Sequence, residues 1–195
     1  MSDTKEKILD VSLELFSCSG YEAVSVSDIA GRLDMTKGAL YKHFKNKQDI
    51  FDSLVTRMEQ LYSTAFAAFD ADSCEEYSHP DLPEALKAVL CCCTSLFSFW
   101  TGDPFACRFR KMLILEQYGN SEMSRLYKNY FVSGPMEQLT ELLRSHHVPG
   151  ASEKAVTLYS AVYLFYSVLD SAEDRMCTSA VLKENIERLC FKVIG

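Results

Sequence analysis

Apolar residues recur along the chain at the three- and four-residue spacing of amphipathic helices, and this pattern predicts an all-α fold. The first case is a helix that Asp3 or Thr4 can cap and that runs to about Cys18 with a broad apolar stripe. Gly20 follows as the expected left-handed terminator. The chain has only 8 Gly and 5 Pro, and no polar–apolar alternation lasts more than a few residues, so we expect no sheet.

Two short helices separated by a tight turn are predicted next. The first carries an apolar stripe at helical spacing, formed by Val26, Ile29, Ala30 and Leu33. A break at Asp34 follows, and Thr36 can cap the second helix because its hydroxyl accepts a backbone N–H. We expect the second helix to span 37–44, with Leu40 and Phe44 on its inner face. Two short helices joined in this way, packed on the first helix, are typical of a helix-turn-helix head.

The remaining helices are predicted from apolar periodicity and from breaks at Gly, Pro and polar runs. Asn46 can cap a long helix that runs to about Asp70, which we expect to act as a lever between ligand and DNA. The polar segment 71–81 is predicted to be a loop. Further helices are predicted at about 82–100, 104–118, 121–147, 152–170 and 178–193. The third of these should be kinked or split at Gly134-Pro135.

The last two predicted helices carry more apolar surface than one subunit needs. Residues 155–169 are apolar on nearly every face, and such a helix is buried from more than one side. A stripe on the final helix is formed by Leu182, Ile186, Leu189 and Val193. We therefore expect the two helices to pair with their copies in a four-helix homodimer interface. The alternative is that the core of one subunit is filled by Tyr159, Tyr163 and Tyr166.

A basic segment stands out in an acidic chain. Residues 32–47 carry a net charge of +4, whereas the whole chain carries −7 and the remainder therefore −11. A local basic patch is the footprint of phosphate binding, because neutralised phosphates release counterions. Gly38 lets a backbone come close to a partner, and the Ala39 methyl can pack on a thymine methyl. Tyr41 and His43 offer donors to phosphate oxygens. The alternative for each residue alone is a solvated or packing role.

The segments D-I-A at 28–30 and T-K-G-A-L-Y-K-H-F-K-N-K at 36–47 resemble the DNA-binding region of the tetracycline-repressor (TetR) family. The family often has Gly where Asp34 stands and Thr where Ala39 stands, so the resemblance does not extend to the operator sequence.

This resemblance implies a homodimeric, all-helical transcription regulator with residues 1–46 as DNA-binding domain and 47–195 as ligand-binding and dimerisation domain. It implies a repressor that a small-molecule effector releases from a palindromic operator in double-stranded DNA. Together with the outward position of Lys42, it predicts DNA contacts by Thr36, Lys37, Gly38, Ala39, Tyr41, Lys42, His43 and Lys47.

An effector pocket is expected among the C-terminal helices, which are rich in aromatic and soft side chains. The candidates to line it are Phe97, Trp100, Phe105, Phe109, Met112, Tyr127, Tyr163 and Tyr166. Aromatic residues at helical spacing are also typical of a core, and this alternative stays open. Arg108 and Arg110 are candidates to pair with an anionic effector.

The eight cysteines, at 18, 74, 91–93, 107, 177 and 190, show no zinc-finger spacing, and we expect them to be reduced in a cytosolic chain. Three consecutive helical cysteines diverge by about 100° each and cannot share one metal. The sequence shows no nucleophile–base spacing and no glycine-rich phosphate loop, so we expect no catalysis, cofactor or metal. The alternatives are a helical ligand carrier, a cysteine-dependent redox sensor, and an interaction module that binds an acidic partner.

No segment approaches the roughly 20 uninterrupted apolar residues of a membrane helix. Residues 1–19 are charged and amphipathic and lack the apolar core of an export signal. We therefore expect a cytoplasmic protein without a membrane partner.

Overall fold

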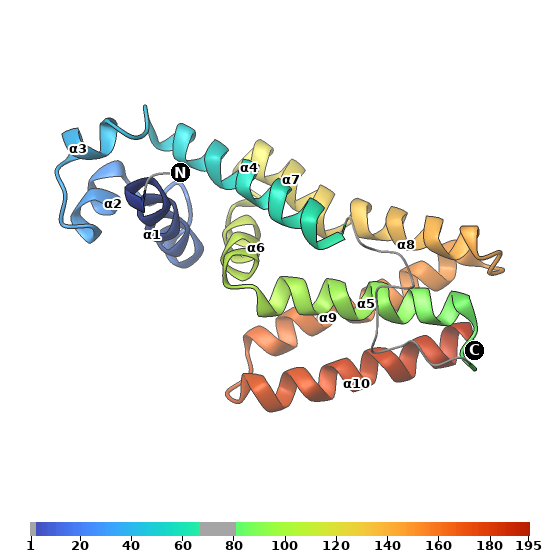
Figure 1. Ribbon diagram of the computed structural model, residues 1–195. Coiled ribbons are helices and arrows are strands. Elements are labelled where there is room, and N and C mark those ends of the chain that lie inside the picture. The colour runs from blue at the N-terminus through green and yellow to red at the C-terminus, as the bar shows by residue number, and fades with distance from the viewer. Residues whose placement is uncertain (1–2, 67–80) are drawn as a thin grey trace. The chain divides into compact units, whose positions relative to one another are not determined.

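The computed structural model describes residues 3–66 and 81–195, and these ranges contain helices and no strand (Figure 1). The helices are α1 (Asp3–Ser19), α2 (Val26–Arg32), α3 (Lys37–Tyr41), α4 (Lys47–Phe66), α5 (Glu84–Gly102), α6 (Pro104–Glu116), α7 (Ser121–Phe131), α8 (Ser133–Ser145), α9 (Ala151–Asp170) and α10 (Arg175–Ile194). The all-α prediction is confirmed. The end of the helix predicted to reach Asp70, and all of the predicted loop except its last residue, lie outside the described residues.

The chain divides into two compact units. The first contains the described residues 3–66 and 104–127, and the second contains 81–103 and 128–195. The helix-turn-helix therefore belongs to the same unit as α4 and α6. The functional boundary at residue 46 falls inside the first unit and stays a prediction.

In the first unit, α1 packs against α2, α4 and α6. Its apolar stripe is fully buried at Ile8, Leu9, Leu13 and Phe16. Gly20 ends the helix with a φ of +85°, as predicted, and its N–H donates to the Phe16 carbonyl oxygen at 3.0 Å. Arg57 of α4 donates to Glu6 of α1 at 2.7 Å, and its guanidinium lies 4.6 Å from the centre of the Phe105 ring in α6. One side chain thus joins three helices of this unit.

In the second unit, α5 packs against α8, α9 and α10. Its Trp100 ring is fully buried, with its centre 4.4 Å from that of Phe131. Phe97 stacks on Tyr166 of α9, with ring centres 6.2 Å apart and planes inclined by 4°. The Tyr159 hydroxyl donates to the Phe131 carbonyl oxygen at 3.0 Å, so the polar end of this buried ring is satisfied.

Helix α5 is also the one helix of the described ranges that is long and apolar enough to cross a membrane by length and composition. It includes Glu84 and Lys87, so it is not an uninterrupted apolar run. Its apolar window is 61% buried inside the structure, as expected for a core helix.

The predicted helix 121–147 is split, as expected near Gly134-Pro135. Helix α7 ends at Phe131 and α8 begins at Ser133. A side chain at Gly134 would collide with the Asn129 carbonyl oxygen, and Pro135 has no N–H with which to continue the helical ladder.

Half of the apolar stripe of α10 is buried inside its own unit. Leu182 and Ile186 are buried because α10 packs along α5 and α9, whereas Leu189 and Val193 are half-buried. The pairing of α9 and α10 with a second copy stays a prediction. Tyr159 and Tyr166 are buried as well, as the core-filling alternative predicted. Tyr163 differs from them, since 39% of its surface is exposed.

Candidate nucleic-acid interface

The helix-turn-helix consists of α2, a tight turn and α3, and each part has a local cause. At the start of α2, the Ser25 hydroxyl accepts the Asp28 N–H at 3.3 Å, and Asp28 accepts the Ser25 N–H at 2.8 Å. Hydrogen bonds from the Ser25 hydroxyl and then from its N–H hold the pKa of Asp28 below its usual value. Asp34 turns the chain with a φ of +52°, which Asp tolerates better than most residues. Thr36 caps α3, as predicted, by accepting the Ala39 N–H at 3.1 Å.

Helix α3 is shorter than the predicted span of 37–44, because regular α-helix ends at Tyr41. Beyond this point the backbone tightens, and the His43 N–H donates to the Leu40 carbonyl oxygen at 2.9 Å. Leu40 and Phe44 are nevertheless both buried. The inner face of α3 was therefore predicted correctly, although the residue at which the helix ends was not.

The outer face of α3 is open to solvent. Tyr41 has 50% of its surface exposed, and the other exposed residues are Thr36, Lys37, Gly38 and Lys42. Ala39 and His43 are half-buried. A Cβ atom at Gly38 would meet only the Thr36 hydroxyl oxygen, at 3.9 Å. The fold thus does not require glycine at this position, and the close approach of a partner's backbone stays a prediction.

The lysines of the basic segment differ in what they already bind. In the part of the chain that the structure describes, neither Lys37 nor Lys42 forms a salt bridge, so both can meet phosphate without breaking an ion pair. Lys47 donates to the carbonyl oxygens of Tyr21 at 2.8 Å and Glu22 at 3.4 Å, and its Nζ lies 4.2 Å from the centre of the Tyr21 ring. Lys47 therefore has a structural role, and its DNA contact stays a prediction.

The eight residues predicted to line an effector pocket are divided between the two units. Phe105, Phe109, Met112 and Tyr127 belong to the first, and the second contains Phe97, Trp100, Tyr163 and Tyr166. All except Tyr163 are buried, as the core alternative also predicts. Arg110 is buried and Arg108 half-buried. A pocket lined by these residues stays a prediction.

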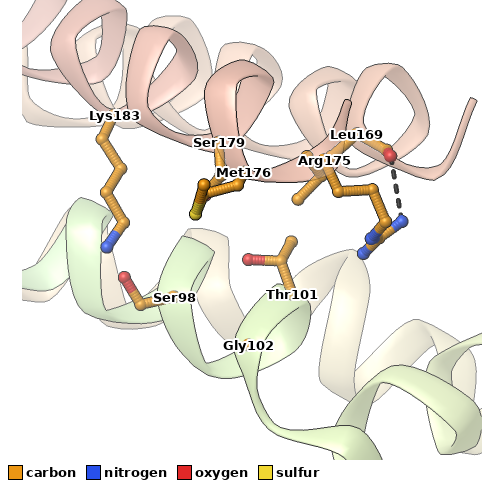
Figure 2. A pocket seen from close by; sticks show the side chains of 8 residues that line it. All are labelled: Ser98, Thr101, Gly102, Leu169, Arg175, Met176, Ser179 and Lys183. Carbon is orange, nitrogen blue, oxygen red and sulfur yellow. Dashed lines mark hydrogen bonds between the residues drawn. The ribbon is translucent and has the colours of Figure 1, made fainter. Parts of the chain in front are cut away.

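A hollow of about 350 Å³ in the second unit is lined by other residues (Figure 2). Figure 2 shows Lys183 and Arg175 of α10 near its two ends, with Ser98 and Thr101 of α5 and Met176 between them. Arg175 is oriented by a 3.0 Å hydrogen bond to the Leu169 carbonyl oxygen and a 3.6 Å contact with Asp170. Two cations and nearby hydroxyls suit a small anion. The signal in the sequence was the four-residue spacing of 175, 179 and 183, which places these residues on one helix face.

A second hollow, of about 540 Å³, lies between α1 and α4 in the first unit. Three acidic residues line it, together with the paired Arg57: Glu6, Asp49 and Asp52. An acidic lining repels phosphate, so this surface is unsuited to DNA. Among the described residues, no group of three His, Cys, Asp or Glu side chains could hold a metal ion.

The free cysteines of the described ranges differ sharply in accessibility. Cys18 and Cys177 are exposed, whereas the buried ones are Cys92, Cys93 and Cys190. Burial raises the pKa of Cys92 to about 12, and a hydrogen bond with Cys190, together with burial, raises the pKa of Cys93. Because the thiolate is the reactive form, these buried thiols are poor redox sensors. The expectation that the cysteines are reduced is met by the free cysteines of the described ranges and stays a prediction for the others.

We expect a thiol reagent at about pH 8 to label Cys18 and Cys177 in the folded protein, and to reach Cys92 and Cys93 only after unfolding.

The pKa of Cys92 is higher in the folded chain than its ordinary value of 9.0, so only the unfolded chain loses this proton as the pH rises above about 9. The free energy of unfolding should therefore fall between about pH 9 and 12. Mass spectrometry of labelled peptides and urea unfolding check both results. Rapid labelling of Cys93 in the folded protein would instead favour the redox-sensor alternative.

Residues 8–54 match the family model described as bacterial regulatory proteins, tetR family. Over 52 residues the chain is 44% identical to the HTH-type transcriptional regulator AcrR of Shigella flexneri. This aligned segment covers 27% of this chain and 24% of AcrR. Over 51 residues it is 39% identical to IcaR of Staphylococcus aureus, the negative transcriptional regulator of the biofilm operon icaADBC, which covers 26% of this chain and 27% of IcaR. The matched segment thus spans about a quarter of the length of these curated relatives.

Solved structures match over almost the whole chain. A tetR-family regulatory protein from Rhodococcus RHA1 superposes with a TM-score of 0.67 at 16% identity, covering 100% of this chain and 98% of that one. NalD of Pseudomonas aeruginosa superposes with a TM-score of 0.62 at 19% identity, and the match covers 100% of this chain and 98% of NalD. A transcriptional regulator from Saccharomonospora viridis, solved in complex with choline, gives 0.64 at 18% identity, covering 96% and 95%.

In its amino-terminal region, residues 8–54, the chain is thus similar in sequence to the tetR family of bacterial regulatory proteins. The chain as a whole has the fold of tetR-family regulators.

Proposed function

We propose that this protein is a sequence-specific DNA-binding transcriptional regulator that acts as a repressor. The observation that carries the proposal is the exposed outer face of α3, where glycine is not required by the fold at position 38 and neither Lys37 nor Lys42 forms a salt bridge among the described residues. Although the chain has a net charge of −7, these lysines form a local basic surface that attracts DNA phosphate.

The names of the relatives support a repressor. IcaR is a negative transcriptional regulator, and NalD is the secondary repressor of the MexAB-OprM multidrug efflux pump. The choline complex of the Saccharomonospora viridis regulator supports the binding of a small-molecule effector, which would release the protein from DNA. Such a role needs no catalytic residue, cofactor or metal, and a protein that binds DNA in this way would act in the cytoplasm.

The DNA contacts follow from the chemistry of the α3 face. Lys37 and Lys42 neutralise phosphates, and Tyr41, with its exposed ring and hydroxyl, donates to a phosphate oxygen. Ala39 packs against a thymine methyl where Gly38 allows close approach. The remaining predicted contacts are Thr36, His43 and Lys47.

A homodimer is supported by the outer face of α9. Four apolar side chains remain exposed on this one helix: Val156, Tyr163, Leu164 and Val168. They lie on one broad side of the helix, where a copy of the same helix would bury them. On α10, Val181 and Phe191 are exposed and can join this interface, together with the half-buried Leu189 and Val193 of the predicted stripe. A dimer can hold two heads about 34 Å apart, the spacing of successive major grooves on a palindrome.

Titration of the purified protein with fluorescent DNA from its own upstream region, at several salt concentrations, tests the proposed function. We expect a sequence-specific complex whose affinity falls steeply as salt rises. Failure to prefer any upstream fragment, or any sequence from a random pool, over competitor DNA would contradict the proposal. The interaction-module alternative predicts instead that an acidic protein partner binds and DNA does not.

A further inference from the structure

The connection between α6 and α7 contacts the turn between α1 and α2, which leads into the helix-turn-helix of the first unit. Helix α6 ends at Glu116, and Asn120 caps α7 by accepting the N–H groups of Glu122 and Met123 at 3.1 Å each. Its amide nitrogen lies 3.5 Å from the Glu22 carboxylate in the α1–α2 turn. The cap of α7 is thus also a contact with the head.

Glu116 makes the most buried of these contacts. Only 9% of its surface is exposed, and its Oε1 accepts the Glu22 N–H at 3.3 Å. A Cβ atom at Gly20 would lie 2.5 Å from the same oxygen, and Gly20 has a φ of +85°. The carboxylate therefore occupies the space that a side chain at position 20 would fill. Because a buried carboxylate is costly without hydrogen bonds, its position against this turn is not incidental.

The same turn holds the start of α4. Lys47 donates to the carbonyl oxygens of Tyr21 and Glu22 at 2.8 and 3.4 Å. The Tyr21 hydroxyl donates to Gln48 at 3.0 Å, and the Gln48 amide nitrogen donates to Glu122 at 3.2 Å. Burial, and then the charges of Glu22, Asp52 and Glu122, raise the pKa of Tyr21 to about 12, so its hydroxyl stays a donor. We call the residues that make these contacts the corner cluster. Its members are Gly20, Tyr21, Glu22, Lys47, Gln48, Glu116, Asn120 and Glu122.

We propose that Glu116 is a positioning residue for DNA binding: by holding the α1–α2 turn against the end of α6, it sets the orientation of the helix-turn-helix and keeps Lys47 at that turn. The proposal rests on the proposed DNA-binding function. Without the Glu116–Glu22 hydrogen bond, the end of α6 and the cap of α7 keep only the longer Asn120–Glu22 contact with this turn.

Two substitutions at Glu116 separate its hydrogen bond from its volume. Glu116→Gln keeps an acceptor oxygen for the Glu22 N–H, whereas Glu116→Leu removes it. We expect Glu116→Leu to weaken binding to a selected operator by about tenfold and to speed hydrogen exchange of the Glu22 amide by at least about tenfold. Glu116→Gln should stay within about threefold of the original protein in both operator affinity and Glu22 exchange rate. The matched control is Glu141→Leu, at a side chain of α8 that is 76% exposed, which should change neither.

A double-mutant cycle with Gly20 tests the same contact from the other side. Gly20→Ala strains the backbone in either background, because the φ of this residue is +85°. The collision of the new Cβ atom with the Glu116 carboxylate adds to this strain only in the original chain, so Gly20→Ala should weaken operator binding there by about threefold more than in the Glu116→Ala background. If Glu116→Leu does not fold, this cycle and Glu116→Gln decide the question.

Unchanged operator affinity and unchanged Glu22 exchange in Glu116→Leu, or additive effects in the cycle, would overturn the inference. Loss of DNA binding in Glu116→Gln would also contradict it, because the acceptor is preserved. If the original protein binds no specific DNA, the proposed function fails, and exchange at Glu22 still shows whether Glu116 holds the turn.

Discussion

Replacing Lys37 and Lys42 together with alanine should weaken operator binding by about 100-fold at low salt and make the residual binding less dependent on salt. Both side chains are exposed on α3, and no salt bridge among the described residues competes for them. Each phosphate contact contributes about −0.9 to the slope of log affinity against log salt, so the loss of two contacts should reduce the slope by about two units. Fluorescence anisotropy at four or five salt concentrations measures affinity and slope together.

The matched control for this variant is the pair Lys128→Ala and Lys183→Ala. Both lysines are exposed and lie in the second unit, and their removal changes the net charge by the same amount. We expect this control to keep the original slope. If both pairs lower the slope equally, overall charge rather than the α3 face attracts DNA, and the contact assignment is wrong.

The substitution Leu164→Glu should convert the protein from dimer to monomer and lower its affinity for a palindromic operator by about 100-fold or more. Leu164 has 58% of its surface exposed and lies on the same side of α9 as Tyr163 and Val168. Burial of a glutamate against an apolar copy of this face would cost several kcal/mol. A monomer also loses the gain from having its second head already held near the second half-site. Analytical ultracentrifugation gives the oligomeric state, and the anisotropy titration gives the affinity.

The control for this substitution is Leu115→Glu on α6. Leu115 has 51% of its surface exposed, so the change introduces the same charge at a similar degree of exposure. This variant should stay a dimer and bind the operator as the original protein does. Persistence of the dimer in Leu164→Glu would show that α9 does not form the interface.

The features of the head that were correctly predicted all depend on interactions within a few residues. Thr36 accepts the N–H of Ala39 three positions on, Gly20 adopts the positive φ angle that glycine permits, and the predicted break at Asp34 is present as a turn. Leu40 and Phe44 lie one helical turn apart, which predicts a shared face. The capping box of Ser25 and Asp28 has the same local character and could have been predicted from its spacing.

Other features depend on which distant segment packs against a residue. The α10 stripe at Leu182 and Ile186 was correctly assigned as apolar, but periodicity cannot distinguish burial against α5 from burial against a second subunit. The early end of α3 at Tyr41 has the same kind of cause, since Phe44 must reach the core before Asn46 caps α4 at the Asp49 N–H. The aromatic residues predicted to line a pocket are similarly buried, and their spacing alone does not separate core from cavity.

The amino-acid sequence alone was enough to establish the helices, the helix-turn-helix and the charge of its outer face, because capping, periodicity and charge act over one or two helical turns. It could not reveal the role of Glu116, whose hydrogen-bond partner Glu22 is 94 positions away. Nor could it show that Lys47 is already bound to the α1–α2 turn. Such contacts exist only after distant helices have packed, since the packing brings the donor, the acceptor and the space at Gly20 together.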